Sequence, residues 1–479
     1  MIIQKAQYRP ATAEVHRNNP LIEALPDYLE WRPREILKKL SKVPQMPNAR
    51  ATRSQNAAWL NNLPPALFVP TKRHYALFET IDLLIRQGYV LRNPITPERA
   101  AYLRDAYARQ QAGEKVLDST FEEEVHEQLT ASLIGTSGMG KTRTVERVLT
   151  CYPQLIEHDR AYMGGPILQI VYLHVECPHD GSVIALCRNL LNEIDRLTGN
   201  EYRQKFRITD RTTLETLKST LVHVLAVHYV GIIVIDEIQN LTSSRKNRED
   251  LFNFIVSLSN SLNVPLLFVG TPKIYEFLTS NVRTARRFGT RGFINWKPLE
   301  KDSKEWKSIT AELWKYNLLQ NDADGMPEEI EEKLFERSFG IVEVLLKLYI
   351  LTQNRILLLT SRKNSGTARK MTPEAIDYIF EEFFKNMEPI LTKLHKGDMD
   401  ALRKLEDIAM PDNLEELTAQ MRAEIDLEHE DLDEDELQKQ DLQDSISGNM
   451  AYAGEDVPPV AKNIAEGIIN GEAPEKEPA

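Results

Sequence analysis

A single eight-residue segment constrains the fold of this chain more than any other feature. It reads Gly135-Thr136-Ser137-Gly138-Met139-Gly140-Lys141-Thr142 and fits the phosphate-loop pattern G-x-x-x-x-G-K-S/T at every required position. The glycines let backbone N–H groups turn toward phosphates, Lys141 can reach the β- and γ-phosphates, and the Thr142 hydroxyl can bind Mg²⁺. An apolar run, Leu129 to Ile134, precedes the loop, and a helical pattern, Thr144 to Leu149, follows it. This order of strand, loop and helix predicts a nucleoside-triphosphate site rather than an unliganded glycine turn.

A second segment supplies the carboxylates that such a site needs. The apolar run Val230 to Ile235 is typical of a buried parallel strand, and it ends in Asp236 and Glu237. We expect Asp236 to hold Mg²⁺, directly or through water, and Glu237 to polarise the water that attacks the γ-phosphate. An isolated Asp-Glu pair often only caps a helix. Here the spacing of about 95 residues from the phosphate loop leaves room for an intervening strand with its helices, which favours the nucleotide site.

Two further polar positions indicate an oligomeric ATPase. Thr271 follows the predicted strand Leu266 to Val269, where a side chain at the sheet edge can sense the γ-phosphate. Arg286 and Arg287 lie just before the next predicted strand, where a guanidinium can reach a neighbouring subunit's nucleotide and stabilise transition-state charge. Ordinary solvated surface charge is the alternative for this arginine pair.

The remaining pattern predicts an α/β architecture with a five-stranded, mainly parallel sheet covered by helices on both faces. We expect an N-terminal arm with helices in residues 1–110, a nucleotide-binding core in 111–300, a small helical lid in 301–400 and a tail in 401–479. The predicted strands are Leu129–Ile134, Ile167–Val175, Val230–Ile235, Pro265–Val269 and Gly292–Trp296. The predicted helices include Thr71–Gln87, Thr96–Gln111, Ile341–Leu359 and one beginning at Thr372 and Pro373.

The acidity of the chain is concentrated in its tail. Residues 401–479 hold 6 Lys and Arg against 22 Asp and Glu. Residues 1–400 therefore hold 53 basic and 49 acidic residues. The tail is poor in aromatic residues, and we expect it to be largely disordered. An apolar island, Val460 to Ile469, could fold on a partner, and a merely solubilising tail is the alternative.

Other features bound the location and exclude some site types. No run of 18 apolar residues exists and the N-terminus lacks a secretion signal, so we expect a cytoplasmic protein with no membrane partner. Cys151, Cys177 and Cys187 are too few and too irregularly spaced for a disulfide framework. His174, Cys177 and His179 lack the second ligand pair of a closed zinc site.

The order of these motifs resembles that of AAA+ ATPases. Narrower matches resemble the TnsC/TniB family of ATP-dependent regulators of Tn7-like DNA transposition. They are Asn19 to Pro26, Val69 to His74, Ile85 to Tyr89 with Arg92 to Pro94, Val175 to Ser182, and Ile235 to Leu241. The resemblance covers about residues 15–390. It implies a bacterial, nucleoid-associated protein that binds ATP and Mg²⁺ and assembles as a ring or helical filament on double-stranded DNA. It also implies partners, namely a transposase and a target selector of the TnsD/TniQ kind.

The chain departs from the AAA+ pattern at the start of the lid. Many members place an arginine there to touch the γ-phosphate, whereas this chain has Glu343, with Lys347 one turn later. We leave this second sensor unassigned and expect slow hydrolysis. The candidate DNA contacts are Arg203, Lys205, Arg207 and Arg211. They could grip phosphates without reading sequence, or could form an ordinary solvated face.

Two other functions share most of these motifs. A replication initiator or helicase loader differs by binding a replicative helicase instead of a transposase. A small-molecule kinase differs by requiring an acceptor. The paired Asp236 and Glu237 favour hydrolysis over phosphoryl transfer, because they place a metal ligand and a base side by side.

Overall fold

The computed structural model describes residues 2–48, 50–96, 129–159, 167–242, 250–251, 253–255, 263–275, 288–319, 325–359, 370–395 and 414–425. The predicted helix Thr96–Gln111 and the pair Arg286 and Arg287 lie outside these residues, apart from the first residue of that helix. Among the described helices, none combines the length and apolar character that crossing a bilayer requires.

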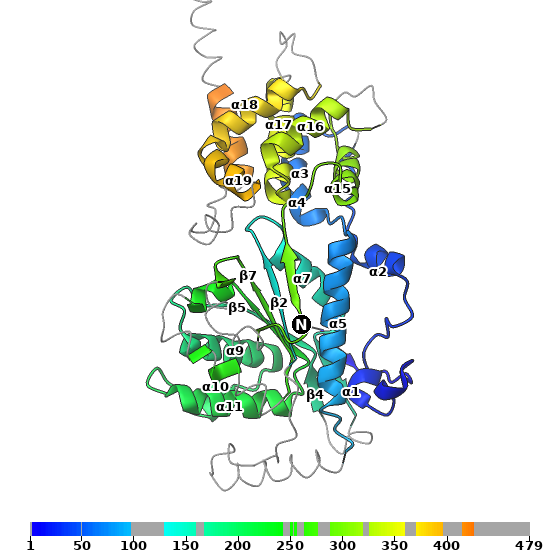
Figure 1. Ribbon diagram of the computed structural model, residues 1–479, viewed down its shortest axis with the longest axis vertical. Coiled ribbons are helices and arrows are strands. Elements are labelled where there is room, and N and C mark those ends of the chain that lie inside the picture. Colours follow the sequence, from blue (N-terminus) through cyan, green and yellow to red (C-terminus); the bar gives the residue numbers. More distant parts are fainter. Residues whose placement is uncertain are drawn as a thin grey trace, which may run out of the picture.

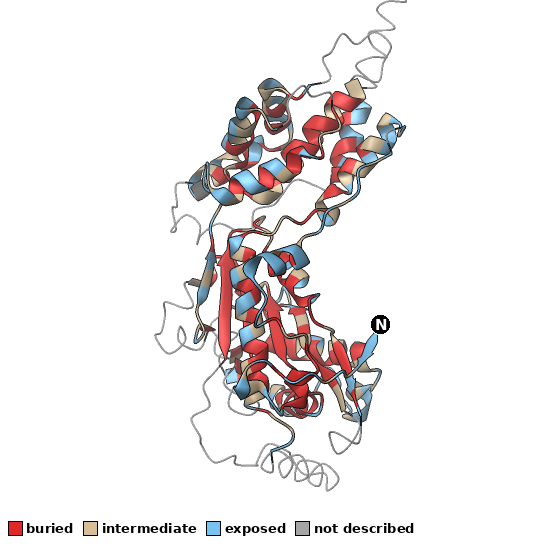
Figure 2. Cartoon of the chain, turned by 90° about the vertical axis from the view of Figure 1, so that its right-hand side faces the viewer, coloured by how far each residue is buried: buried red, intermediate tan, exposed pale blue. Residues whose placement is uncertain are grey.

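The centre of the molecule is a five-stranded sheet in the order β5-β6-β7-β2-β8, with every pair parallel (Figure 1). The strands are β5 (Tyr172–Glu176), β6 (Ile232–Asp236), β7 (Leu266–Gly270), β2 (Thr130–Gly135) and β8 (Phe293–Trp296). This confirms the predicted sheet. Every residue of β2, β6 and β7 is buried, as expected for strands covered on both faces (Figure 2).

Successive residues of β6 point to opposite faces, and each face has its own helical layer. Ile232 and Val234 pack with α5 (Lys72–Val90) and α7 (Lys141–Leu149) in one buried cluster. Ile233 and Ile235 pack with α9 (Val183–Thr198) and α11 (Leu214–Val227) in the other. The short α10 (Tyr202–Lys205) lies with α9 and α11 (Figure 1).

One predicted strand is wrong in detail. The run Ile167–Val175 divides at Val171 into β4 (Ile167–Ile170) and β5, which belong to different sheets. β4 pairs with β3 (Leu155–His158), which also pairs with β1 (Ile3–Lys5), in a small second sheet. The chain changes partners at Val171, whose N–H donates to Gln154 while its carbonyl accepts from Ile232. The run is mostly apolar, with no glycine, proline or other turn residue at the point of exchange.

The lid contains more of the chain than residues 301–400. Its own helices are α15 (Lys304–Trp314), α16 (Glu328–Ser338), α17 (Val342–Leu359), α18 (Pro373–Phe383) and α19 (Glu388–His395), with η4 (Lys385–Met387) before the last. The arm contributes α3 (Arg53–Asn61), which packs against α17, and α4 (Leu63–Ala66) (Figure 1). The other arm elements are η1 (Glu14–His16), α1 (Pro20–Glu23) and α2 (Pro33–Leu40).

Residues 414–425 also form a helix on this lid, although they belong to the segment that we expected to be largely disordered. The buried residues are Leu414, Leu417, Thr418, Met421 and Ile425. The Thr418 hydroxyl lies 3.1 Å from both Asn61 Oδ1 and Asn354 Nδ2, and Asn354 Nδ2 donates to Asn61 at 2.7 Å. This polar cluster joins the arm, α17 and the tail.

Candidate nucleotide-binding site

The phosphate loop connects β2 to α7 at the carboxyl edge of the sheet. Gly138 and Gly140 have φ values of 78° and 76°, which glycine adopts without the strain that a side chain would cause. Gly135 has a different role, because a Cβ built there would lie 2.6 Å from the backbone oxygen of Trp296. Its missing side chain therefore lets β8 approach β2.

The loop's polar side chains are placed for phosphate binding. Lys141 is buried, and its Nζ donates to the Thr136 carbonyl at 2.9 Å. The Thr136 hydroxyl is buried, and no residue that the structure describes is its hydrogen-bond partner. A buried polar atom without a partner costs free energy, so a ligand atom that reached this hydroxyl would remove that cost.

The predicted metal ligands meet at the same edge. The Thr142 hydroxyl donates to Asp236 Oδ2 at 2.6 Å, and the backbone N–H of Glu237 donates to Asp236 Oδ1 at 2.8 Å. Nε2 of His174 lies 3.7 Å from Asp236. Burial acts to raise the pKa of Asp236, but the hydrogen bonds from His174, Thr142 and Glu237 outweigh burial and lower it. Asp236 is therefore ionised at neutral pH, and the two oxygen ligands fit the preference of Mg²⁺.

β7 lies between the phosphate-loop strand and the carboxylate strand, and it ends at Gly270 and Thr271. The Thr271 hydroxyl is buried and has no hydrogen-bond partner within the described part of the chain. Glu237 has a φ of 53°, a left-handed conformation that is uncommon outside glycine and recurs at functional sites. The structure thus brings Lys141, Thr142, Asp236, Glu237 and Thr271 to one edge of the sheet.

The lid closes over this edge. The backbone N–H of Glu343 donates to the Gly138 carbonyl at 3.0 Å, and Lys347 Nζ lies 3.0 Å from Glu343 Oε1. Both side chains line a cleft of about 640 Å³ together with the phosphate loop and Glu237. Asn61 and Pro64 of the arm and Leu414 and Glu415 of the tail complete its rim.

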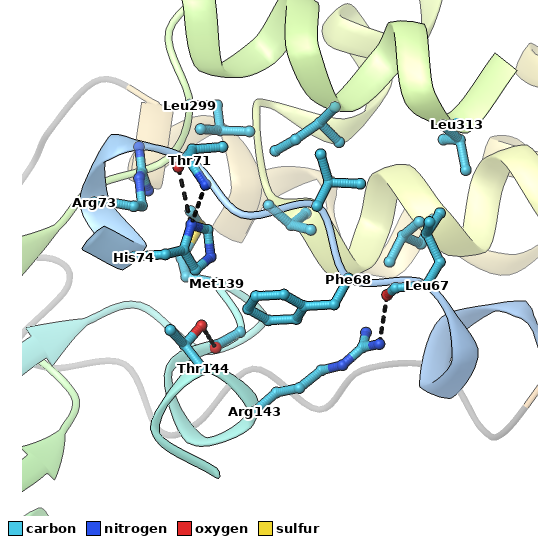
Figure 3. Close-up of a pocket in the computed structure, with 15 residues that line it drawn as sticks. Leu67, Phe68, Thr71, Arg73, His74, Met139, Arg143, Thr144, Leu299 and Leu313 are labelled. Carbon is cyan, nitrogen blue, oxygen red and sulfur yellow. Dashed lines mark hydrogen bonds between the residues drawn. The ribbon is translucent and has the colours of Figure 1, made fainter. Parts of the chain in front are cut away.

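An apolar pocket adjoins the cleft and shares Gly140, Arg143, Val342 and Leu346 with it (Figure 3). Its walls come from the arm (Leu67, Phe68, Val69, Thr71, Arg73, His74), the loop and α7 (Met139, Thr144) and the lid (Leu299, Ile309, Leu313). Arg143 Nη2 donates to the Leu67 carbonyl at 2.5 Å. None of the arm or lid residues of this pocket belongs to the site predicted from the sequence. The segment Val69 to His74 was noted only because it resembles a motif of the TnsC/TniB family.

Comparison with known families agrees with this geometry. Residues 125–278 match the family profile described as an AAA domain. Together with the parallel sheet and the lid, the match establishes an AAA+ P-loop fold. No curated protein matches the chain.

Solved structures similar to the chain share little sequence with it. The Aeropyrum pernix ORC1 protein in complex with DNA has a TM-score of 0.31 and 15% identity, covering 70% of this chain and 84% of that one. Domain III of the Thermotoga maritima replication initiation protein DnaA has a TM-score of 0.31 and 14% identity, and the match covers 61% of this chain and 94% of that one. AMPPCP-bound DnaA from Aquifex aeolicus has a TM-score of 0.32 and 14% identity, and the match covers 79% of this chain and 99% of that one.

A polar clamp ties the lid to the arm beside the apolar pocket. Glu305 of α15 accepts from Arg73 Nη2 at 2.6 Å and from the Thr71 hydroxyl at 2.9 Å. Burial acts to raise the pKa of Glu305, but hydrogen bonding and charge from Arg73 outweigh it and lower the pKa. The clamp therefore carries an ionised carboxylate that holds α15 on the first turn of α5.

The candidate DNA contacts lie elsewhere. Arg203 and Lys205 are on α10, and Arg207 and Arg211 follow it. The Tyr202 hydroxyl of α10 forms a hydrogen bond with His228 Nε2 at 2.7 Å, and His228 lies shortly before the amino end of β6. α10 is therefore far from the phosphate loop, which lies at the carboxyl ends of the strands. Arg203 Nη1 donates a hydrogen bond to Asn192 Oδ1 at 2.9 Å. Lys205, Arg207 and Arg211 are exposed.

The remaining candidates give no additional site. Within the described part of the chain, no group of three or more His, Cys, Asp and Glu residues could hold a metal ion, so His174, Cys177 and His179 do not form one. Arg286 and Arg287 fall outside that part, so their assignment stays a prediction.

Proposed function

We propose that this protein is a Mg²⁺-dependent ATPase. The observation that carries the proposal is the 2.6 Å hydrogen bond between Thr142 and Asp236, with Glu237 as the next residue at the end of a buried parallel strand. These groups supply the hydroxyl, the metal-binding carboxylate and the neighbouring base that hydrolysis of a nucleoside triphosphate uses.

Each residue has a distinct task in this proposal. The phosphate-loop N–H groups and Lys141 bind the phosphates, while Thr142 and Asp236 hold Mg²⁺. Mg²⁺ supplies positive charge that offsets the negative charge of the phosphates. Glu237 orients and polarises water, and the buried Thr271 hydroxyl, which has no partner among the described residues, senses the γ-phosphate. The apolar pocket around Phe68, His74 and Leu313 would take the adenine ring, which has a large apolar face.

We further propose that the ATPase regulates DNA transposition. It would oligomerise on duplex DNA and connect a TnsD/TniQ-type target selector to the transposase. The five sequence motifs that resemble those of TnsC/TniB proteins support this proposal. One of them, Val69 to His74, lines the proposed base pocket, and another, Ile235 to Leu241, carries Asp236 and Glu237.

The test is ATP hydrolysis by the purified protein with and without duplex DNA, in the absence of any small acceptor. Stimulation by DNA is the expected result, and a requirement for an acceptor would favour a kinase. Binding assays with the transposase and with a replicative helicase then separate a transposition regulator from a helicase loader. Binding of the helicase alone would contradict the transposition proposal.

A further inference from the structure

The side-chain amide of Gln239 connects the end of β6 to the end of β7. Gln239 lies in η3 (Ile238–Thr242), is 6% exposed and has no role in the site described above. Its Nε2 donates to Oε2 of Glu237. Its Oε1 accepts from the backbone N–H of Thr271 at 3.1 Å. One amide thus contacts both the proposed base and the strand end that bears the proposed sensor.

The chemistry of the two contacts fixes the orientation of the amide. The Thr271 N–H can only donate, so the carbonyl oxygen of Gln239 must face it. The NH₂ group must then face the Glu237 carboxylate, which can only accept when it is ionised. A carboxamide has one donor end and one acceptor end, and therefore satisfies both neighbours at once.

The backbone around the amide is shaped to admit it. A Cβ built on Gly270 would lie 2.8 Å from Oε1 of Gln239 and 2.7 Å from Cγ2 of Ile238. Glycine at position 270 therefore allows Gln239 to reach the end of β7. Glu237 itself lies in a tight turn, since its carbonyl accepts from Asn240 N at 3.0 Å.

We propose that Gln239 is a positioning residue that holds the Glu237 carboxylate in its working orientation and links that orientation to the end of β7. The proposal rests on the ATPase function proposed above. Thr271 donates its N–H to Gln239, and among the described residues its hydroxyl has no hydrogen-bond partner. A displacement of Thr271 by bound phosphate therefore moves the amide, and the amide moves the carboxylate.

Two substitutions test the link by removing the amide while retaining its size. Gln239→Met removes both hydrogen bonds, and Gln239→Glu replaces the donor with a second carboxylate facing Glu237. Because a general base contributes about 10²- to 10⁴-fold, we expect loss of its positioning to lower kcat by about 10- to 100-fold. Neither KM for ATP nor the affinity for a fluorescent ATP analogue should change by more than about 2-fold, because Gln239 does not line the cleft.

The matched control is Asn240→Ala, which removes a neighbouring amide that donates to the Cys177 carbonyl at 3.3 Å. It should retain kcat. In the Glu237→Gln background, Gln239→Met should cause no further loss of the residual turnover, because both changes act through one carboxylate. Wild-type kcat in both Gln239 variants would overturn the proposal while leaving the ATPase function intact. Additive losses in the double variant would also overturn it.

A structural measurement is independent of turnover. Crystal structures of the wild type and of Gln239→Met with a non-hydrolysable ATP analogue should show the Glu237 carboxylate in different orientations. An unchanged carboxylate would contradict the positioning role, whether or not the protein hydrolyses ATP.

Discussion

The hydroxyl of Thr142 donates a 2.6 Å hydrogen bond to Asp236, a residue 94 positions away in the sequence. This contact joins the phosphate loop after β2 to the end of β6, across the intervening strand β7. It places the two proposed metal ligands together before any ion binds. The geometry of the site is therefore largely preformed.

Lys141 and Glu237 should separate nucleotide binding from hydrolysis. Lys141→Ala should abolish ATP binding, because it removes the loop's phosphate-binding ammonium. Glu237→Gln should retain binding, reduce turnover to a small residual rate and trap the DNA-bound assembly, because it removes the base but keeps the shape. Filter binding and phosphate release measure the two steps. Wild-type hydrolysis in Glu237→Gln would contradict the assignment.

Lys347 is our candidate for the second sensor, because its Nζ lies in the cleft 3.0 Å from Glu343. Lys347→Ala should weaken ATP binding by about 10-fold, or about 1.4 kcal/mol, while ADP binding changes less. The matched control is Lys385→Ala, which breaks another i,i+4 pair, with Glu381, in the lid. Equal losses for ATP and ADP would show that Lys347 does not contact the γ-phosphate.

His74 should make stability fall in mild acid. Burial, followed by the nearby Arg73 charge, lowers its pKa from 6.5 to about 4. Between these values the unfolded chain binds more protons, so the free energy of unfolding decreases as pH falls from 6.5 toward 4. The contribution of His74 is at most about 1.4 kcal/mol per pH unit.

The variant for this test is His74→Asn, whose side-chain oxygen can replace Nδ1 as acceptor for the Thr71 N–H. Urea unfolding at several pH values should show a shallower decrease for His74→Asn than for wild type. The exposed His179→Asn serves as the control and should leave the slope unchanged. Identical slopes for wild type and His74→Asn would rule out this contribution.

The tail should divide into a structural part and a recruiting part. Truncation after Ile425 should leave the melting temperature and ATPase activity unchanged, but should remove transposase binding through Val460 to Ile469. Truncation before Leu414 should also lower the melting temperature by several degrees. It exposes the apolar surface that residues 414–425 cover, and it removes the hydrogen bonds of Thr418 to Asn61 and Asn354. Thermal unfolding and pulldown with the transposase measure the two effects. Equal melting temperatures for both truncations would show that residues 414–425 do not stabilise the lid.

Arg286 and Arg287 should act between subunits. Replacing both by Ala should leave the monomer's ATP affinity nearly intact and remove DNA-stimulated hydrolysis. Mixing this variant with Glu237→Gln protein should restore partial activity, because one kind of interface then has an intact base facing intact arginines. Full activity of the double Ala variant by itself would identify the pair as ordinary surface charge.

The sequence alone determined the elements whose signals are local. The phosphate loop depends on glycines and a lysine at fixed spacing, and Asp236 and Glu237 follow an unbroken apolar strand. The five parallel strands and the cap of α18, where the Thr372 hydroxyl accepts from Ala375 N at 3.3 Å, were likewise predictable. Each of these features is set by neighbouring residues, so tertiary contacts did not need to be known.

Tertiary structure decided the contacts between distant segments. The apolar pocket takes its walls from the arm, the loop and the lid, and no periodicity predicts that these three segments meet. The exchange of strand partners at Val171 occurs inside a mostly apolar run that contains no turn residue. Residues 414–425 carry Leu414, Leu417, Met421 and Ile425 at helical spacing, which is a signal for an amphipathic helix. The acidic composition of the whole tail nevertheless favoured the prediction of disorder. An amphipathic face becomes ordered only when another surface covers it, and here α3 and α17 of the lid provide that surface.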